Sequence, residues 1–224
     1  MRKSESRVKL NRMSATLKLK KQAEIYYPDS DGKPMAETDI HREQMNYLIE
    51  ILKVHFRDRS DVYVSGNIMF YYEKDNPRKV FSPDVMVCFG VSGEDRRTYK
   101  LWEEEQFPQV IFEISSRKTW GDDLNKKWFL YQQFGVKEYY IFDPEYDYLP
   151  EPLIAYRLKR DELKQVALKN NHIFSEEIGL EIVDTGAGLR LFNAQTKEFM
   201  RTLSESESEV IRLREELQKL KSQK

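Results

Sequence analysis

The sequence predicts an α/β fold in which helices cover a mixed β-sheet. Apolar residues recur at helical spacing over 41–56, which indicates an amphipathic helix. Two continuous apolar runs, at 80–90 and 108–116, are bounded by Gly, Pro and Ser and are typical of strands buried on both faces of a sheet. A helical pattern and another strand follow the second run, so a strand, helix, strand unit is expected there.

Length and charge limit the classes of protein. The chain has 224 residues and a mass of 26.8 kDa, enough for one large domain with tails. Its 37 Lys and Arg offset 38 Asp and Glu, so any polyanion has to be bound by a local group of cations. The longest apolar runs are too short to span a bilayer, and we expect no membrane association. The single Cys88 cannot form a disulfide within the chain, which favours the cytoplasm and a buried, inert thiol.

Three regions differ in composition. Residues 1–22 carry eight Lys or Arg against one acid, Glu5, which predicts a mobile basic arm that is either a solvated tail or a phosphate tether. Residues 23–200 have the apolar content of one folded domain. Residues 204–224 form a short amphipathic helix.

The predicted elements follow in chain order. The helix at 41–56 presents Met45, Leu48 and Leu52 on one face, and either Thr38 or Asp39 is a suitable N-cap. The stretch 61–72 is rich in β-branched and aromatic residues and predicts strand, interrupted near Gly66. The strands at 80–90 and 108–116 come next.

A polar segment separates these two strands. Its composition predicts that residues 91–107 form a flexible flap outside the sheet. After the second strand, Leu124 to Phe134 keep helical spacing and Gly135 is a candidate left-handed C-cap, before a strand at 137–144. Shorter strands are expected at 153–158, 163–168, 180–185 and 189–193, and we expect them to form a peripheral antiparallel extension.

The terminal helix carries an apolar stripe. Val210, Leu213, Leu217 and Leu220 are spaced 3, 4 and 3 residues apart, with charged residues between them. This spacing predicts a coiled coil, although the same leucines can dock on their own domain. We expect a homodimer, formed through this helix or through a sheet edge.

Two acidic residues lie in apolar surroundings. Asp84 follows Pro83 before an apolar run, and Glu113 stands within the run VIFEISS. Ionised carboxylates are costly to bury without a cation, and two on adjacent strands repel each other. A divalent ion of the Mg²⁺ or Mn²⁺ type would compensate both, since His41, His55 and His172 are scattered and Cys88 has no partner at zinc-site spacing.

Four motifs then carry a resemblance. SPDVMV, VIFEISS, DLNKKWFLY and FGVKEYYIFDP, in this order, resemble the Uma-two family of the PD-(D/E)xK nuclease superfamily, and especially its cyanobacterial members. The similarity runs from about residue 25 to 193. It implies a restriction-endonuclease-like core of helix, mixed sheet, helix and strand. The implied activity is metal-dependent endonucleolytic hydrolysis of DNA.

The resemblance also assigns catalytic residues. It makes Asp84 and Glu113 the motif carboxylates that bind the metal, with the main-chain carbonyl of Ile114 as a further ligand. The superfamily lysine would stand two residues after Glu113, where this chain has Ser115. A lysine on the following helix is the expected substitute, with Lys127 as first choice and Lys126 as second.

Accessory residues surround this set. Asp123 and Tyr131 lie one helical turn before and after Lys127 and are expected to orient it by hydrogen bonding. The family tends to place Glu before a His in the first helix, whereas His41 here follows Ile40. His41 is therefore either a catalytic accessory or a solvated helix-start residue. An accessory carboxylate would come from Glu37, Asp39 or Glu43.

Basic side chains near the site would bind phosphate. The expected nucleic-acid-binding residues are Arg117, Lys118 and Lys126, supported by Arg96, Arg97 and Lys100 from the flap.

Other interpretations remain open at this point. Glu113 and Lys127 can form a purely structural ion pair. The chain can then be a catalytically silent nuclease fold that binds nucleic acid or acts as a scaffold. The basic arm also permits an antitoxin-like or mobile-element accessory protein.

Overall fold

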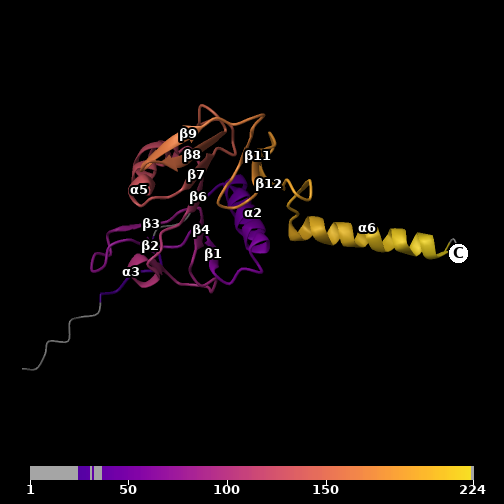
Figure 1. The fold of residues 1–224 in the computed structure, drawn as a ribbon, viewed down its shortest axis with the longest axis horizontal. Coiled ribbons are helices and arrows are strands. Elements are labelled where there is room, and N and C mark those ends of the chain that lie inside the picture. Colours follow the sequence, from indigo (N-terminus) through magenta and orange to yellow (C-terminus); the bar gives the residue numbers. More distant parts are fainter. Residues whose placement is uncertain (1–24, 31, 33–36, 223–224) are drawn as a thin grey trace, which may run out of the picture.

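The chain folds as a central mixed sheet with helices and two smaller sheets packed on it (Figure 1). The computed structural model describes residues 25–30, 32 and 37–222, so the predicted basic arm at 1–22 lies outside the described residues. The α/β class is confirmed, as is the order of helix, strands, helix and strand that the sequence predicts.

Within the described residues the largest sheet has six strands in the order β1-β4-β6-β7-β8-β9. Strands β6 and β7 pair in parallel and the other neighbours are antiparallel, so this sheet is mixed. Its strands are β1 (Val62–Ser65), β4 (Val85–Phe89), β6 (Val110–Ile114), β7 (Glu138–Phe142), β8 (Leu153–Lys159) and β9 (Glu162–Val166).

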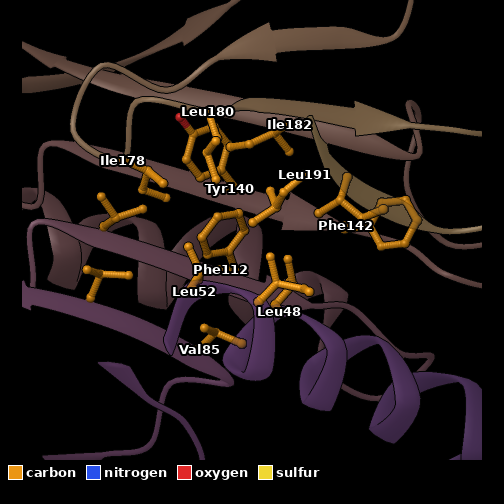
Figure 2. Close-up of a cluster of buried hydrophobic side chains, with 14 of the residues drawn as sticks. Leu48, Leu52, Val85, Phe112, Tyr140, Phe142, Ile178, Leu180, Ile182 and Leu191 are labelled. Atoms are coloured by element: carbon orange, nitrogen blue, oxygen red, sulfur yellow. The ribbon is translucent and has the colours of Figure 1, made fainter. Parts of the chain in front are cut away.

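Helix α2 (Asp39–His55) covers one face of this sheet. Its N-cap is Thr38, whose hydroxyl accepts the hydrogen bond of the His41 amide. Figure 2 shows Leu48 and Leu52 pointing from α2 toward Val85 and Phe112 of the sheet. The helix is held by the burial of this apolar face, as its periodicity predicts.

A second sheet closes the same core. It has the order β10-β11-β12-β13, and Ile182 and Leu191 reach from it into the cluster that includes Leu48 and Phe112 (Figure 2). Its strands are β10 (His172–Phe174), β11 (Glu181–Asp184), β12 (Leu189–Asn193) and β13 (Glu198–Phe199).

The predicted peripheral extension is therefore partly wrong. Strands β8 and β9 continue the main sheet, because β8 pairs along its length with β7, and only the later strands are separate. Those later strands are also not peripheral, since Ile182 and Leu191 are completely buried.

The opposite face of the main sheet packs on the crossover between β6 and β7. This crossover consists of α4 (Trp120–Asp122), a π-helical turn η1 (Asp123–Lys127) and α5 (Trp128–Gln133). It begins before Leu124, the predicted start, and it contains one π turn that the periodicity does not predict. Gly135, at φ 72°, ends it as expected, with hydrogen bonds from Gly135 N to Gln132 O and from Val136 N to Tyr131 O.

Period-two alternation divides β6 between the two faces. Val110, Phe112 and Ile114 belong to the core under α2, whereas Ile111 belongs to the core under α5. Glu113 alternates with Phe112 and therefore points toward α5. The acidic residue thus lies on the face covered by the crossover.

The segment between β4 and β6 is anchored, which corrects the predicted flexible flap. Its residues form β5 (Tyr99–Lys100), which pairs in parallel with β2 (Phe70–Tyr71), and α3 (Leu101–Glu104). Tyr99 is completely buried, and its hydroxyl donates to the carbonyl of Gln106. The polar residues of this segment lie outside while one aromatic ring attaches it to the core.

The run at 80–90 forms two strands and not one. β3 (Val80–Phe81) pairs with β2, and β4 begins at Val85. Pro83 lacks the N–H group that a continuous strand would require, so the chain changes sheets at this point. Asp84 lies directly after this break.

The C-terminal helix α6 (Leu203–Ser222) extends away from the sheets (Figure 1). Among the described helices, none is long and apolar enough to cross a membrane.

Gly66 allows the chain after β1 to approach the backbone of Asp84. A Cβ atom at Gly66 would lie 1.9 Å from the Asp84 carbonyl oxygen and 2.8 Å from Cδ1 of Ile49. The next residue adds a backbone hydrogen bond between the same two segments, from Asn67 N to Pro83 O at 2.9 Å. The position of Asp84 therefore depends on residue 66 being a glycine, which has no side chain.

We predict that Gly66→Ala lowers the free energy of unfolding by about 1–3 kcal/mol, because the added methyl group pushes the two segments apart. Urea denaturation measures this loss. Gly121→Ala is the matched control, since nothing lies within 4 Å of a Cβ atom there. Equal stability of the two variants would show that the contact at Gly66 relaxes without cost.

Candidate active site

Sheet register brings Asp84 and Glu113 together. β4 and β6 are antiparallel with Val85 opposite Phe112, so Asp84, one residue before β4, lies opposite Glu113. Asp84 Oδ2 accepts the Ile114 amide at 2.8 Å, and the Asp84 amide points to Glu113 Oε2 at 3.4 Å. The two acids that the sequence singles out are neighbours at one end of the sheet.

Glu113 is completely buried, and both of its carboxylate oxygens have partners. Oε1 accepts the Tyr131 hydroxyl at 2.5 Å, and Oε2 lies 2.8 Å from Lys127 Nζ. Burial raises the pKa of Glu113 to about 8, although the nearby ammonium group opposes that shift. The carboxylate therefore needs a cation to remain ionised.

Lys127 lies between two carboxylates. Its Nζ is 2.9 Å from Asp123 Oδ1 as well as 2.8 Å from Glu113 Oε2. Burial alone would lower the pKa of Lys127, but these two acids raise it, so the amine is held as an ammonium ion. The predicted second choice, Lys126, instead pairs with Asp122 at 2.9 Å on the surface.

The π turn and Ser115 fix this arrangement. Asp123 and Lys127 are the first and last residues of η1, and both point toward β6. Ser115 Oγ donates to Asp123 Oδ2 at 2.9 Å, and Tyr139 Oη donates to the Asp123 carbonyl at 2.9 Å. Ser115 stands where the resemblance leads us to expect a lysine, and its hydroxyl binds the acid that pairs with Lys127.

His41 approaches the site from the first turn of α2. Its Nε2 is 3.5 Å from Asp84 Oδ2 and its Nδ1 is 3.5 Å from Glu37 Oε2. Burial alone would lower the pKa of His41, but the two carboxylates raise it. Burial would likewise raise the pKa of Asp84, but the hydrogen bond with His41 and the charge of Lys127 lower it.

Of the three candidate accessory acids, Glu37 reaches the site. Asp39 pairs with Arg42 on the surface, and Glu43 is exposed. His41 is only 6% exposed, which excludes the interpretation as a solvated helix-start residue.

A cavity of about 390 Å³ opens above these groups. Asp84, His41 and Lys127 line its floor, and Glu113 lies beneath them. Of the predicted phosphate-binding residues, Arg117 and Lys118 line the cavity and Lys126 does not. The cavity is thus lined by both acidic and basic side chains.

The predicted contribution of the flap cations is wrong. Arg96 is engaged by Glu104 at 2.6 Å, Arg97 by Asp29 at 2.5 Å and Lys100 by Glu103 at 3.1 Å. None of these three side chains lines the cavity above Asp84. They hold the segment between β4 and β6 in place.

Sequence reasoning missed Asp143 and the loop that it orders. Asp143 is completely buried after β7, and its carboxylate accepts the amides of Glu145, Asp147, Tyr148 and Leu149. This places Glu145 and Tyr148 on the cavity wall. The available signal was an aspartate that directly follows a buried strand.

The donor set fits a hard divalent ion. Among the described residues, no three Asp, Glu, His or Cys side chains form a ready metal cluster. Asp84, Glu113 and the Ile114 carbonyl supply oxygen donors only, which suits Mg²⁺ or Mn²⁺. In the described part of the chain, Asp84 Oδ1 accepts no hydrogen bond and is therefore available as a donor.

Removing the Lys127 ammonium tests the charge balance of this site. We predict that Lys127→Met lowers the free energy of unfolding by about 3–5 kcal/mol above about pH 8, where Glu113 is ionised and is left buried without a cation. The loss shrinks as the pH falls below about 8, because burial raises the pKa of Glu113 to about that value and a protonated carboxyl group needs no cation. Urea denaturation over a pH series measures both effects.

Lys126→Met is the matched control, since this side chain is 79% exposed and should change stability by less than about 0.5 kcal/mol. Adding Glu113→Gln to Lys127→Met should recover part of the loss. Additive losses in the double variant would contradict direct coupling of the two groups.

His41 provides a second test. Its folded-state pKa should exceed 6.5, so its protonation stabilises the fold below that pH and this contribution is lost as pH rises through the folded-state pKa. Asp84→Asn should lower the pKa of His41 most, and Glu37→Gln should lower it less. Histidine ring signals followed by NMR measure these values, and a wild-type pKa at or below 6.5 would refute the contacts described.

The chain is similar to known proteins. One solved structure similar to the chain is described as a "putative nuclease belonging to DUF820 from Anabaena variabilis ATCC 29413"; it is 14% identical, with a TM-score of 0.48, over 65% of this chain and 76% of that chain. No curated protein matches the chain in sequence. Residues 13–182 match Uma2, described as "Putative restriction endonuclease". This match covers well over half of the sequence, and the chain belongs to the Uma2 family.

Proposed function

We propose that the protein is an endonuclease that hydrolyses DNA phosphodiester bonds with Mg²⁺ or Mn²⁺. Membership of the Uma2 family supports nuclease chemistry in general. The observation that carries the finer proposal is that Asp84 and Lys127 line one cavity together with basic side chains, and that the buried Glu113 contacts both of them.

The two carboxylates and the Ile114 carbonyl would hold the divalent ion. Such an ion, when bound, withdraws charge from the phosphate and lowers the pKa of a water molecule. Tyr131 fixes one oxygen of Glu113 by its hydrogen bond, which leaves Oε2, now paired with Lys127, to face the ion. Asp84 presents its free oxygen Oδ1 from the opposite strand.

Lys127 would neutralise charge in the transition state or position the attacking water. Asp123 keeps the ammonium group beside the cavity, because this pair does not depend on Glu113. The lysine can therefore leave Glu113 without leaving the site. Its raised pKa keeps it a hydrogen-bond donor and prevents it from acting as a base at neutral pH.

Arg117 and Lys118 would bind the DNA backbone. They follow β6 directly and line the same cavity as Asp84. Because the whole chain carries a net charge of −1, these local cations have to supply the attraction for phosphate, together with Lys126 on the surface of η1.

One observation favours a second candidate, a catalytically silent nuclease fold that binds nucleic acid or acts as a scaffold. Both oxygens of Glu113 are already satisfied by Tyr131 and Lys127. The charge of this acid is thus balanced without a metal ion, as in a structural ion pair.

Plasmid cleavage in Mg²⁺ or Mn²⁺ separates the two candidates. We predict that Asp84→Asn, Glu113→Gln and Lys127→Ala each reduce the cleavage rate by roughly 100-fold or more, because each removes a group that stabilises the developing charge. Lys164→Ala is the matched control, because this exposed lysine of β9 pairs with Glu162 and does not line the cavity, and it should keep most of the activity.

Thermal unfolding of each variant, measured beside its activity, distinguishes lost chemistry from lost fold. Equal cleavage by all variants would reveal a contaminant or another site. A folded wild type that cleaves neither duplex DNA, single-stranded DNA nor RNA with either ion would favour the silent fold.

A further inference from the structure

Helix α6 (Leu203–Ser222) exposes an apolar face that its own domain does not cover. None of its described side chains is buried, and it extends away from the sheets (Figure 1). Its exposed apolar residues are 45–66% accessible: Leu203, Val210, Ile211, Leu213, Leu217 and Leu220. In proteins most helical stability comes from the packing of an apolar face, so we expect this face to have a partner.

The start of α6 is fixed firmly to the domain. Thr202 and Glu205 form a reciprocal capping box, with Glu205 N donating to Thr202 Oγ1 and Thr202 N donating to Glu205 Oε2. Arg190 of β12 donates to both oxygens of Glu205, and Glu50 of α2 accepts the Leu203 amide at 2.7 Å. The direction in which the helix leaves the domain is therefore set.

The apolar residues follow a heptad pattern. Leu203, Val210 and Leu217 are seven residues apart, and Leu213 and Leu220 follow Val210 and Leu217 by three. These are a and d positions of a coiled coil. Among the a residues Val210 is β-branched, and a β-branched residue at a with Leu at d favours two strands. Ile211 is equally exposed but lies outside this seam.

Charges beside the seam determine the orientation. Glu209 and Glu216 occupy g positions, whereas Arg214 and Lys221 occupy e positions, as does Glu207 in the first heptad. In a parallel pair each g residue faces the e residue five positions later on the other helix, so Glu209 meets Arg214 and Glu216 meets Lys221. An antiparallel pair would place Glu opposite Glu at g and Arg or Lys opposite each other at e.

We propose that α6 pairs with α6 of a second copy of this chain as a parallel two-stranded coiled coil. This arrangement places both α/β domains at the same end of the coil, because each helix leaves its domain in a fixed direction. The pairing goes beyond the proposed function and does not depend on it, since a chain that cleaves nothing would still pair.

Light scattering of the full chain during size-exclusion chromatography tests the pairing. The wild type should have twice the single-chain mass of 26.8 kDa, and Leu213→Glu should return it to one chain. Ile211→Glu is the matched control, because it places the same charge two residues away but outside the seam, and it should remain a dimer. Thermal unfolding should show an intact domain in both variants.

Cysteine cross-linking tests the orientation. Leu220→Cys should form a disulfide between chains in mild oxidant, since only a parallel pair brings these two positions together, and Ile211→Cys should not. The native Cys88 is buried and should not react. A wild type that stays a single chain at every concentration, dimers of Leu213→Glu, or cross-linking at position 211 in place of 220 would each overturn the proposal.

Discussion

The structure around the candidate site depends on one constraint, the charge of a carboxylate with no access to water. Glu113 alternates with Phe112 on β6, so the register that buries Phe112 under α2 directs Glu113 under the crossover helix. A buried acid in that position requires a cation, and breaking such a pair costs about 3–5 kcal/mol. Lys127 supplies the cation, and Asp123, Ser115 and Tyr139 in turn hold the lysine.

The same constraint bears on the proposed catalysis. In the proposed nuclease a divalent ion would take the place of the Lys127 ammonium group beside Glu113, while Lys127 keeps a second partner in Asp123. Asp84 lies between β3 and β4, directly after Pro83, and so brings a free carboxylate oxygen to the same cavity. The π turn places Asp123 and Lys127 on the same side of the crossover, and such turns are frequent at functional sites.

Much of the fold and of the candidate site could be predicted from local signals in the sequence. The parts that could not be predicted depend on contacts between residues far apart in the chain. Periodicity identifies the buried face of α2, and Gly135 marks the end of the crossover because only residues that tolerate positive φ fit there. Asp84 and Glu113 stand out because acids in apolar runs conflict with burial. The flap prediction failed because one buried ring, Tyr99, decides the order of a polar segment. Asp143 was missed because its partners are backbone amides of a loop, and their positions cannot be inferred from the spacing of residues in the sequence.

The central claim is that this charge cluster binds a divalent ion through Asp84 and Glu113. Calorimetric titration of the protein with Mn²⁺ tests it most directly and requires no knowledge of the substrate. The wild type should bind one ion per chain, and Asp84→Asn, which keeps the shape of the side chain, should abolish that binding. No binding by the wild type, or equal binding by both proteins, would show that the site is a structural ion pair and contradict the account.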